Sequence, residues 1–279
     1  MKTIHANGRP IGDGHPTFII AEVGINHNGQ VGLAERLIDA AARAGADAVK
    51  FQTYVTEQRV PRSNPIFDVL KRCEISFSQQ ARLKEYAEQQ GLLFFSTPFD
   101  LESVAFLQSL GVGLYKIASF DLVNLQLLRA VAATGAPVVV SRGMATAEEI
   151  DTAVGVLKMA GSLYALLHCI SAYPTPEESA NLNVIRTLAQ RYGCPVGYSD
   201  HTVGIDVPVY AVAVGAQLIE KHFTLDRHAE GPDHAMSADP SLLAELVRRI
   251  RSVERILGHA ELRAYEVEQA TLVYRRVNQ

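Results

Sequence analysis

The feature that most constrains the fold is a regular alternation of short apolar runs with longer amphipathic runs along nearly the whole chain. The short runs lack polar–apolar alternation, which is typical of strands buried on both faces of a parallel sheet. Eight of them predict strands, at residues 17–23, 46–52, 92–96, 113–117, 137–141, 163–169, 195–198 and 217–222. The amphipathic runs predict helices at 31–44, 79–90, 101–110, 125–134, 147–160, 182–191, 205–214 and 241–257.

Eight strand–helix units in 279 residues predict an α/β fold, a (β/α)8 TIM barrel. The alternative is a doubly wound sheet, which usually has a glycine-rich GxGxxG turn after its first strand; the turn here reads EVGINHNG. An Asn-Gly pair at Asn7 and Gly8 predicts a short hairpin within 1–16 that covers the bottom of the barrel. We expect the barrel over 17–257 and a helical extension over 258–279, with no further domain.

Composition excludes several classes of protein. A formal net charge of -4 argues against nucleic acid or an anionic membrane as a partner. No apolar run is long enough for a membrane span, and residues 1–16 contain no apolar core of a secretory signal. Three widely spaced cysteines predict neither a disulfide framework nor a thiolate zinc site, so we expect a cytoplasmic protein.

All eight predicted strands end in polar groups, which is where TIM barrels place their chemistry. In strand order these groups are Glu22; Lys50 and Gln52; Thr97; Lys116, Ser119 and Asp121; Ser141; His168, Ser171 and Tyr173; Ser199, Asp200 and His201; and Glu220, Lys221 and His222. A structural barrel would need only some of these ends to be polar. The convergence predicts an enzyme, and the connection 53–78 is long enough to be functional.

The two lysines, Lys50 and Lys116, allow three interpretations. They can snorkel to the barrel rim, they can bind phosphate and carboxylate groups together with nearby serines, or one can form a Schiff base. Glu22 ends an apolar strand and therefore needs a partner, either a lysine or a sugar hydroxyl or aldehyde hydrate.

Two histidines, His201 and His222, end adjacent strands and predict a site for one divalent ion. Asp200 and Glu220 could add oxygen groups to that site. His168 has either an orienting or a structural role. It does not form a catalytic pair with Cys169, because neighbouring strand residues point to opposite faces.

The strand ends and the loops that follow them carry motifs that resemble the sialic acid synthase (N-acetylneuraminate synthase) family. The matching segments are FIIAEVGINHNG at 18–29, VKFQT at 49–53, FSTPF at 95–99, YKIAS at 115–119, LHC at 167–169, YPTP at 173–176, GYSDHT at 197–202 and EKHFT at 220–224. They cover nearly the whole chain in order. The resemblance implies a (β/α)8 barrel that condenses phosphoenolpyruvate with an aldose such as N-acetylmannosamine. The products would be a 3-deoxy-2-ulosonic acid and phosphate, with cleavage of the C–O bond.

The resemblance also implies roles for individual residues. Mn²⁺, or Mg²⁺ or Co²⁺ in its place, would bind His201 and His222, and the catalytic residues would be Glu22, Lys50 and Lys116. Phosphate would bind Lys116, Ser119, Ser141 and Ser199, and the phosphoenolpyruvate carboxylate would bind Lys50 and Thr97. The sugar would contact Glu22, Gln52, Tyr173 and Asp233. By analogy with the family we expect a homo-oligomer, a dimer or a tetramer.

The chain departs from the family pattern at four points. Arg142 replaces a threonine, Ser171 replaces an asparagine that helps hold the carboxylate, and Asp121 stands where some members have glutamate. We expect Arg142 and Ser171 to help bind phosphoenolpyruvate. The family pattern usually continues into an antifreeze-like domain; we expect none in this protein, and we therefore expect that a separate antifreeze-like chain can act as its partner. Two alternatives stay open, a Schiff-base lysine aldolase and a non-catalytic barrel that binds a sugar or phosphate.

Overall fold

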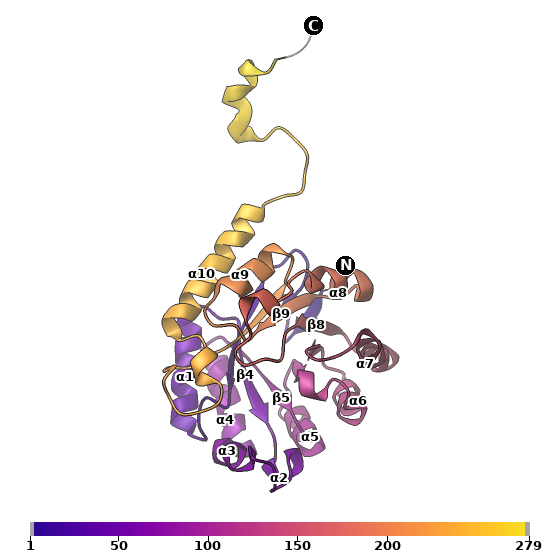
Figure 1. Cartoon of the computed structure of the whole chain (residues 1–279), viewed down its shortest axis with the longest axis vertical. Helices are drawn as coiled ribbons and strands as arrows, with labels where there is room; N and C mark the ends of the chain where they lie inside the picture. The colour runs from indigo at the N-terminus through magenta and orange to yellow at the C-terminus, as the bar shows by residue number, and fades with distance from the viewer. Residues whose placement is uncertain (1–2, 277–279) are drawn as a thin grey trace.

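The chain folds into a closed barrel of eight parallel strands, in the order β10-β3-β4-β5-β6-β7-β8-β9. Figure 1 shows the helices that lie around this barrel. The computed structural model describes residues 3–276. The strands are β3 (Phe18–Gly24), β4 (Ala48–Thr53), β5 (Leu93–Pro98), β6 (Tyr115–Ile117), β7 (Val138–Ser141), β8 (Tyr164–His168), β9 (Val196–Asp200) and β10 (Leu218–His222). The predicted TIM barrel is thus confirmed, and each predicted strand overlaps an observed one.

A ring of helices surrounds the barrel, one after each strand. These are α1 (Val31–Ala44), α4 (Phe77–Gln89), α5 (Leu101–Ser109), α6 (Leu125–Ala133), α7 (Ala147–Met159), α8 (Val184–Tyr192), α9 (Asp206–Ala213) and α10 (Pro240–Leu257). Capping boxes begin α4 at Ser76 and α7 at Thr146, so side chains satisfy the first free N–H groups of both helices.

The alternation of side chains along each strand divides the barrel into two apolar regions and one polar layer. Outward residues such as Ile19, Val49 and Ile219 pack against the helices in the larger core. Inward residues at the N-terminal half of the strands, such as Ile20, Ala48 and Leu218, form a smaller apolar core inside the barrel, the floor. The next inward positions along the same strands are polar and form the candidate site above the floor.

A two-stranded hairpin closes the floor from below, as the sequence predicts. Strands β1 (Ile4–Ala6) and β2 (Arg9–Ile11) pair antiparallel across the Asn7-Gly8 turn, where both residues have positive φ. Ile4 and Ile11 join the apolar floor, and Arg9 donates hydrogen bonds to the carbonyls of Asp47 (3.0 Å) and Gly91.

Two segments take forms that the sequence does not specify. The long connection 53–78 contains two short helices, α2 (Thr56–Arg59) and α3 (Phe67–Cys73). The C-terminal extension contains a 3₁₀-helix, η4 (Glu266–Tyr274), and leads away from the barrel (Figure 1). Nearly all of its side chains up to residue 276 are exposed, so no buried face supports a longer α-helix; residues 277–279 lie outside the described part. Within residues 3–276, no helix combines the length and apolar character that a membrane span requires.

The floor has no room for a side chain at Gly197 of β9. A Cβ atom there would lie 2.3 Å from the carbonyl oxygen of Leu218 and 2.7 Å from Cδ2 of Leu167. We therefore expect Gly197→Ala to lower the free energy of unfolding by about 1–3 kcal/mol, as overpacked cores do. Urea denaturation measures this. Gly155→Ala, inside α7 with open space around it, is the matched control and should be neutral or stabilising. Equal effects of the two substitutions would contradict the account.

Candidate functional site

A cavity of about 440 Å³ lies at the C-terminal ends of the barrel strands. It is lined by twelve of the fourteen residues that the sequence assigns to the site: Glu22, Lys50, Gln52, Thr97, Lys116, Ser119, Ser141, Tyr173, Ser199, His201, His222 and Asp233. They come from every part of the chain between residues 22 and 233. The structure thus brings the predicted site together in one place, although their roles stay predictions.

Strand register sets the order of the charged side chains around the barrel. Glu22 on β3 is paired with His222 on β10 at one side and with Lys50 on β4 at the other. Glu220 on β10 is paired with Ser199 on β9. Because Glu220 and His222 are two residues apart, both point inward, one above the other.

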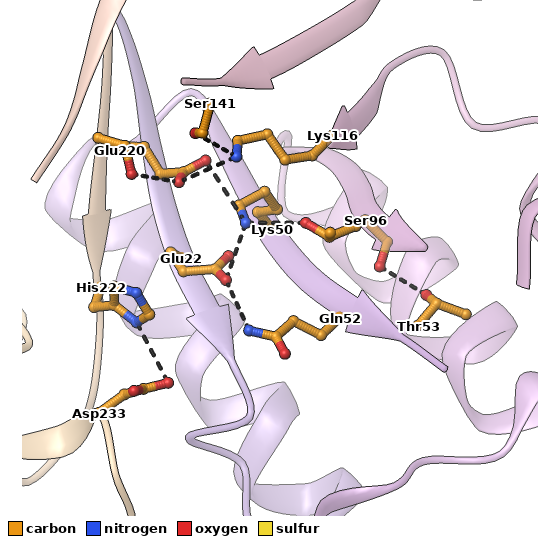
Figure 2. A network of polar contacts seen from close by, with 12 residues as sticks. Glu22, Lys50, Gln52, Thr53, Ser96, Lys116, Ser141, Glu220, His222 and Asp233 are labelled. Carbon is orange, nitrogen blue, oxygen red and sulfur yellow. Dashed lines mark hydrogen bonds and ion pairs between the residues drawn. The ribbon is translucent and has the colours of Figure 1, made fainter. Parts of the chain in front are cut away.

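Two lysines and two glutamates form a buried network at the bottom of the cavity (Figure 2). Nζ of Lys50 lies 3.0 Å from Oε1 of Glu22 and 3.6 Å from Oε2 of Glu220, and it donates to Oγ1 of Thr97 at 3.2 Å. Nζ of Lys116 donates to Oγ of Ser141 at 2.7 Å and lies 3.8 Å from Oε1 of Glu220.

This lysine–glutamate network settles one of the alternatives from the sequence. Both lysine side chains are at most 5% exposed, so they do not snorkel to the barrel rim. Oγ of Ser199 donates to Oε1 of Glu220 at 2.8 Å, and Oε2 of both glutamates is buried without a hydrogen bond among the described residues. The network therefore concentrates two ammonium groups and several hydroxyl donors at the base of the cavity, an arrangement suited to anionic ligand oxygens.

Burial and neighbouring charges give the four groups different proton affinities. Burial raises the pKa of Glu22 to about 7, against the attraction of Lys50. For Glu220 burial also opposes ionisation, but Lys116 and Lys50 outweigh it and lower the pKa. For Lys50 burial opposes the charged form, but Glu22 and Glu220 outweigh it and raise the pKa. Burial lowers the pKa of Lys116, and Glu220 only partly offsets this. Of these four groups, Glu22 is thus the carboxyl whose pKa lies near neutral pH, as a proton-transfer group requires.

The two predicted metal ligands, His201 and His222, face each other with ring centroids 5.7 Å apart. Nδ1 of His201 is 2.8 Å from the carbonyl oxygen of Ile170, so its other ring nitrogen, Nε2, is not engaged in that contact. Nδ1 of His222 is buried without a hydrogen bond among the described residues and lies 3.8 Å from Oδ2 of Asp233. Burial, with the nearby His201 in the second case, lowers the pKa of both rings.

These observations fit a divalent cation. A neutral imidazole is the form that binds a metal, and a buried ring nitrogen without a partner is available as a ligand. No group of three or more His, Cys, Asp or Glu side chains within residues 3–276 is arranged to hold a metal by itself. The protein would thus supply two imidazoles, and oxygen atoms of substrate or water would complete the coordination.

The predicted sugar-binding residues lie on the cavity wall that includes the histidines. Nε2 of Gln52 donates to Oε1 of Glu22 at 3.4 Å. The ring of Tyr173 lies 4.3 Å from that of His201, between centroids. Burial raises the pKa of Asp233, from the loop after β10, to about 6.

Several polar residues from the sequence analysis lie away from the cavity. Arg142 follows the inward Ser141 and therefore points to the opposite face, where its guanidinium contacts Nδ1 of His168 (3.2 Å) and the carbonyl of Ala145 (3.3 Å). The predicted contact of Arg142 with phosphoenolpyruvate is not supported by this geometry. His168 also faces outward, 2.8 Å from the carbonyl of Ala180, which favours its structural role.

Ser171 and Asp200 are also placed outside the cavity. The Oγ atom of Ser171 is buried beside Gly143. A Cβ atom added to Gly143 would lie only 2.4 Å from this Oγ atom. Ser171 is not among the residues that line the cavity. Asp200 points outward and forms a buried ion pair with Lys221 at 2.7 Å, so it is not a cation ligand. Glu220, the other carboxylate considered for the metal, belongs to the lysine–glutamate network.

Among the described residues that line the cavity, Arg59 is the charged one that sequence reasoning misses. It ends α2, in the long connection whose length indicates a function but does not indicate which side chain carries it. The apolar lining residues, among them Ile66, Leu70 and Phe99, are equally hard to find from sequence, because they look like ordinary core positions.

The fold and the site together define a barrel enzyme whose cavity has two lysines and two glutamates at its base and further polar side chains in the rest of its lining. The chain belongs to the NeuB family, whose model matches residues 37–262. The sequence is 50% identical over 94% of its length to an uncharacterized protein of Methanocaldococcus jannaschii, of which it covers 78%. It is 41% identical over 91% of its length to N,N'-diacetyllegionaminic acid synthase of Legionella pneumophila, of which it covers 76%.

A solved structure agrees with this assignment. The N-acetylneuraminic acid (sialic acid) synthetase of Leptospira borgpetersenii, in complex with citrate, matches with a TM-score of 0.94 and 43% identity, over 98% of this chain and 97% of that chain. The resemblance seen in the sequence is confirmed. The chain is an enzyme of the sialic-acid-synthase type, a phosphoenolpyruvate-dependent transferase that forms a C–C bond, and not a non-catalytic barrel.

Glu22 makes the stability of the fold depend on pH. The pKa of Glu22 in the folded protein, about 7, lies above the ordinary value of 4.5, so the folded state favours the protonated form of this side chain more than the unfolded state does. Its contribution to stability is therefore full below about pH 4.5 and is lost as the pH rises through about 7. Glu22→Gln removes this dependence, so the stability of the variant relative to the unmodified protein should increase between pH 5 and pH 8. Denaturation with urea at both pH values measures it; a difference that is flat or falls with pH would contradict the assignment.

Proposed function

We propose that this enzyme condenses phosphoenolpyruvate with an N-acyl aminohexose in its open-chain aldehyde form. The products are a 3-deoxy-2-ulosonic acid of the sialic acid type and inorganic phosphate. The observation that carries the proposal is the buried lysine–glutamate network, which lies at the base of a cavity whose upper wall is formed by two neutral histidines, a glutamine and an aspartate.

The chemistry of the network supports phosphoenolpyruvate as the ligand at the base. Phosphoenolpyruvate carries a phosphate and a carboxylate close together, and Lys116 and Lys50 present two ammonium groups linked through Glu220. Lys116 with Ser119, Ser141 and Ser199 would bind the phosphate. Lys50 with Thr97 would bind the carboxylate, because their side chains are already joined by a hydrogen bond.

The reaction then follows from the electronic structure of the substrates. The methylene carbon of phosphoenolpyruvate attacks the aldehyde carbon with the electron pair of its C=C bond, a C–C bond forms, and the aldehyde C=O bond becomes a C–O⁻ bond. Positive charge develops at C2 and water adds there, and one of the two water protons ends on the former aldehyde oxygen. The second proton leaves the new C2 hydroxyl with the departing phosphate, as the bond from C2 to the bridging oxygen breaks and C2 becomes a ketone. Glu22, with a pKa of about 7, is suited to orient that water and accept its proton. The lysines stabilise the negative charge of the phosphate throughout.

A divalent metal ion would bind His201 and His222 in this proposal, with Mn²⁺ as the first choice. When bound, it supplies a Lewis acid that polarises the aldehyde carbonyl. Burial lowers the pKa of the histidine rings and so favours their neutral, metal-binding form. Tyr173 packs beside His201 and restricts the position of that ring.

The names of the relatives support the class of acceptor. One relative is a synthase of N,N'-diacetyllegionaminic acid and a structural relative is a synthetase of N-acetylneuraminic acid, so both names specify N-acetylated products. We extend this to an acceptor with one or two N-acyl groups, with Gln52, Tyr173 and Asp233 as its contacts. The cytoplasmic location, the homo-oligomer and a separate antifreeze-like chain stay predictions.

An isotope-labelled assay tests the proposed function. The purified protein with Mn²⁺, N-acetylmannosamine or a 2,4-diacetamido hexose, and phosphoenolpyruvate carrying ¹⁸O in its bridging position should release labelled phosphate and form an ulosonic acid. Mass spectrometry follows both products. Lys116→Met should lower kcat/KM by at least about 100-fold, since it removes a charged contact to the phosphate. Unlabelled phosphate would contradict C–O cleavage, and no turnover with any N-acyl aldose would contradict the function.

Removal of the metal gives a second test. Chelation with EDTA should abolish turnover, and Mn²⁺ should restore it. His222→Ala should weaken Mn²⁺ binding, measured directly by electron paramagnetic resonance, while the melting temperature stays close to that of the unmodified protein. His228→Ala is the control, because His228 is exposed in the loop that follows the same strand and does not line the cavity. Unchanged Mn²⁺ binding in His222→Ala would remove this residue from the metal site.

The family assignment argues against the Schiff-base aldolase considered in the sequence analysis, and the pKa values show which lysine such a reaction would have to use. Burial lowers the pKa of Lys116, which makes its amine the better nucleophile, whereas Lys50 is held charged by two glutamates. Borohydride reduction in the presence of a keto acid distinguishes the two functions. A reduced adduct on Lys116 would support the aldolase, and its absence alongside labelled phosphate release supports the condensation.

A further inference from the structure

Arg59 differs from the other two cations of the cavity in having no ion pair within the described residues. Lys50 and Lys116 both lie within ion-pair distance of glutamates. From residue 3 to residue 276, no carboxylate comes within 4.0 Å of the Arg59 guanidinium, whose hydrogen-bond partner is Oε1 of Gln52, at 3.1 Å from Nη1. A guanidinium has five N–H donors, so most of those on Arg59 are not used by this part of the protein.

Aromatic stacking determines which part of Arg59 a ligand can reach. Its Cζ lies 3.5 Å from the ring centroid of Phe99 and 4.7 Å from that of Tyr54. Stacking occupies the faces of the planar group and leaves its edge, where the N–H bonds point. Because Arg59 lines the cavity, this edge is available to a bound molecule.

Arg59 is also connected to the catalytic end of the cavity. Its guanidinium donates a hydrogen bond to the amide oxygen of Gln52, and the amide nitrogen of Gln52 donates one to Glu22. The guanidinium therefore lies one amide group away from the carboxylate that we assign to the reacting water. A substituent close to the aldehyde carbon of an acceptor at Glu22 is within reach of Arg59.

Nearby charges indicate which kind of oxygen fits at this position. The cavity is lined by three cations, Lys50, Lys116 and Arg59, and by three carboxylates, Glu22, Glu220 and Asp233. Burial lowers the pKa of Arg59, and Tyr54, Asp121 and Asp233 oppose that shift from beyond ion-pair distance. These aspartates already compensate the charge of Arg59. A further anion beside them, with phosphoenolpyruvate at the lysines, would be repelled, whereas a neutral carbonyl oxygen would not.

We propose that Arg59 is a specificity-determining residue that donates hydrogen bonds to the acyl carbonyl oxygen of the acceptor. This inference rests on the proposed function and deepens it. It assigns the recognition of the N-acyl group to the long connection after β4, and it predicts that the enzyme selects an uncharged acylated aldose over a phosphorylated one.

The test compares three acceptors: N-acetylmannosamine, mannose, which lacks the acylamino group, and N-acetylmannosamine 6-phosphate. In the unmodified protein, kcat/KM should be highest for N-acetylmannosamine. Arg59→Met should lower that value by about 10- to 100-fold, the usual effect of losing hydrogen bonds from a charged donor, and should change the value for mannose less than about 3-fold. Phosphate release from phosphoenolpyruvate measures each rate.

Two further variants keep the result interpretable. Arg59→Lys retains the charge and the contact with Phe99 but loses the planar fork, so it should show a smaller loss that is again confined to the acylated acceptor. Arg62→Met is the matched control, since Arg62 is exposed on the same connection and does not line the cavity. It should behave like the unmodified protein.

Three outcomes would overturn the inference. An equal loss with mannose would show that Arg59 acts by positioning Gln52 instead. A preference for the 6-phosphate that disappears in Arg59→Met would make Arg59 an anion site. No loss in either Arg59 variant would remove the residue from recognition. If the unmodified protein turns over none of these acceptors, nor a 2,4-diacetamido hexose, the proposed function fails first, so the two failures are distinguishable.

Discussion

Mutual compensation of four buried charges is the interaction on which the site depends. Lys50, Lys116, Glu22 and Glu220 lie inside a barrel whose floor is apolar, and each would be costly there alone. Together they form a chain of contacts in which every lysine faces at least one glutamate. Because strand pairing fixes the neighbours of each residue, the closed sheet is what makes this compensation possible.

The same network gives the two glutamates different pKa values, and therefore different roles. Glu220 lies between both lysines and stays ionised, so it maintains the charge of its neighbours. Glu22 has one close lysine and a pKa of about 7, so it can give or take a proton. Two residues of one type thus obtain different properties from their surroundings, as is common where an active site needs both a fixed charge and a base.

The barrel and most of the site could be predicted from the sequence, because both depend on short-range periodicity. Once a strand is recognised, its inward residues alternate, so Ile20 in the floor leads to Glu22, and Ala48 leads to Lys50. The same alternation gives Arg142 and Asp200 outward positions beside inward ones. Neither residue therefore reaches the cavity, although Arg142 directly follows β7 and Asp200 ends β9, two strands whose ends lie there.

Arg59 could not be found this way, because it lies on a four-residue helix inside a long connection. Such a segment has no period that relates sequence position to direction in space. Its placement depends on stacking with Phe99, a contact between residues 40 positions apart that no local pattern indicates. Ser171, in the loop after β8, is difficult for the same reason.

The apolar floor and the hairpin beneath it limit how molecules can enter and leave the cavity. Ile4 and Ile11 seal the lower end of the barrel, and the lysines lie directly above that seal. Within the described chain, the cavity is therefore closed below the lysines by apolar side chains, and Tyr173, Asp233 and Arg59 are part of its remaining lining. If the substrates bind as proposed, with phosphoenolpyruvate at the lysines and the aldose at that wall, the sugar would cover the anion, and phosphoenolpyruvate would have to bind before the aldose.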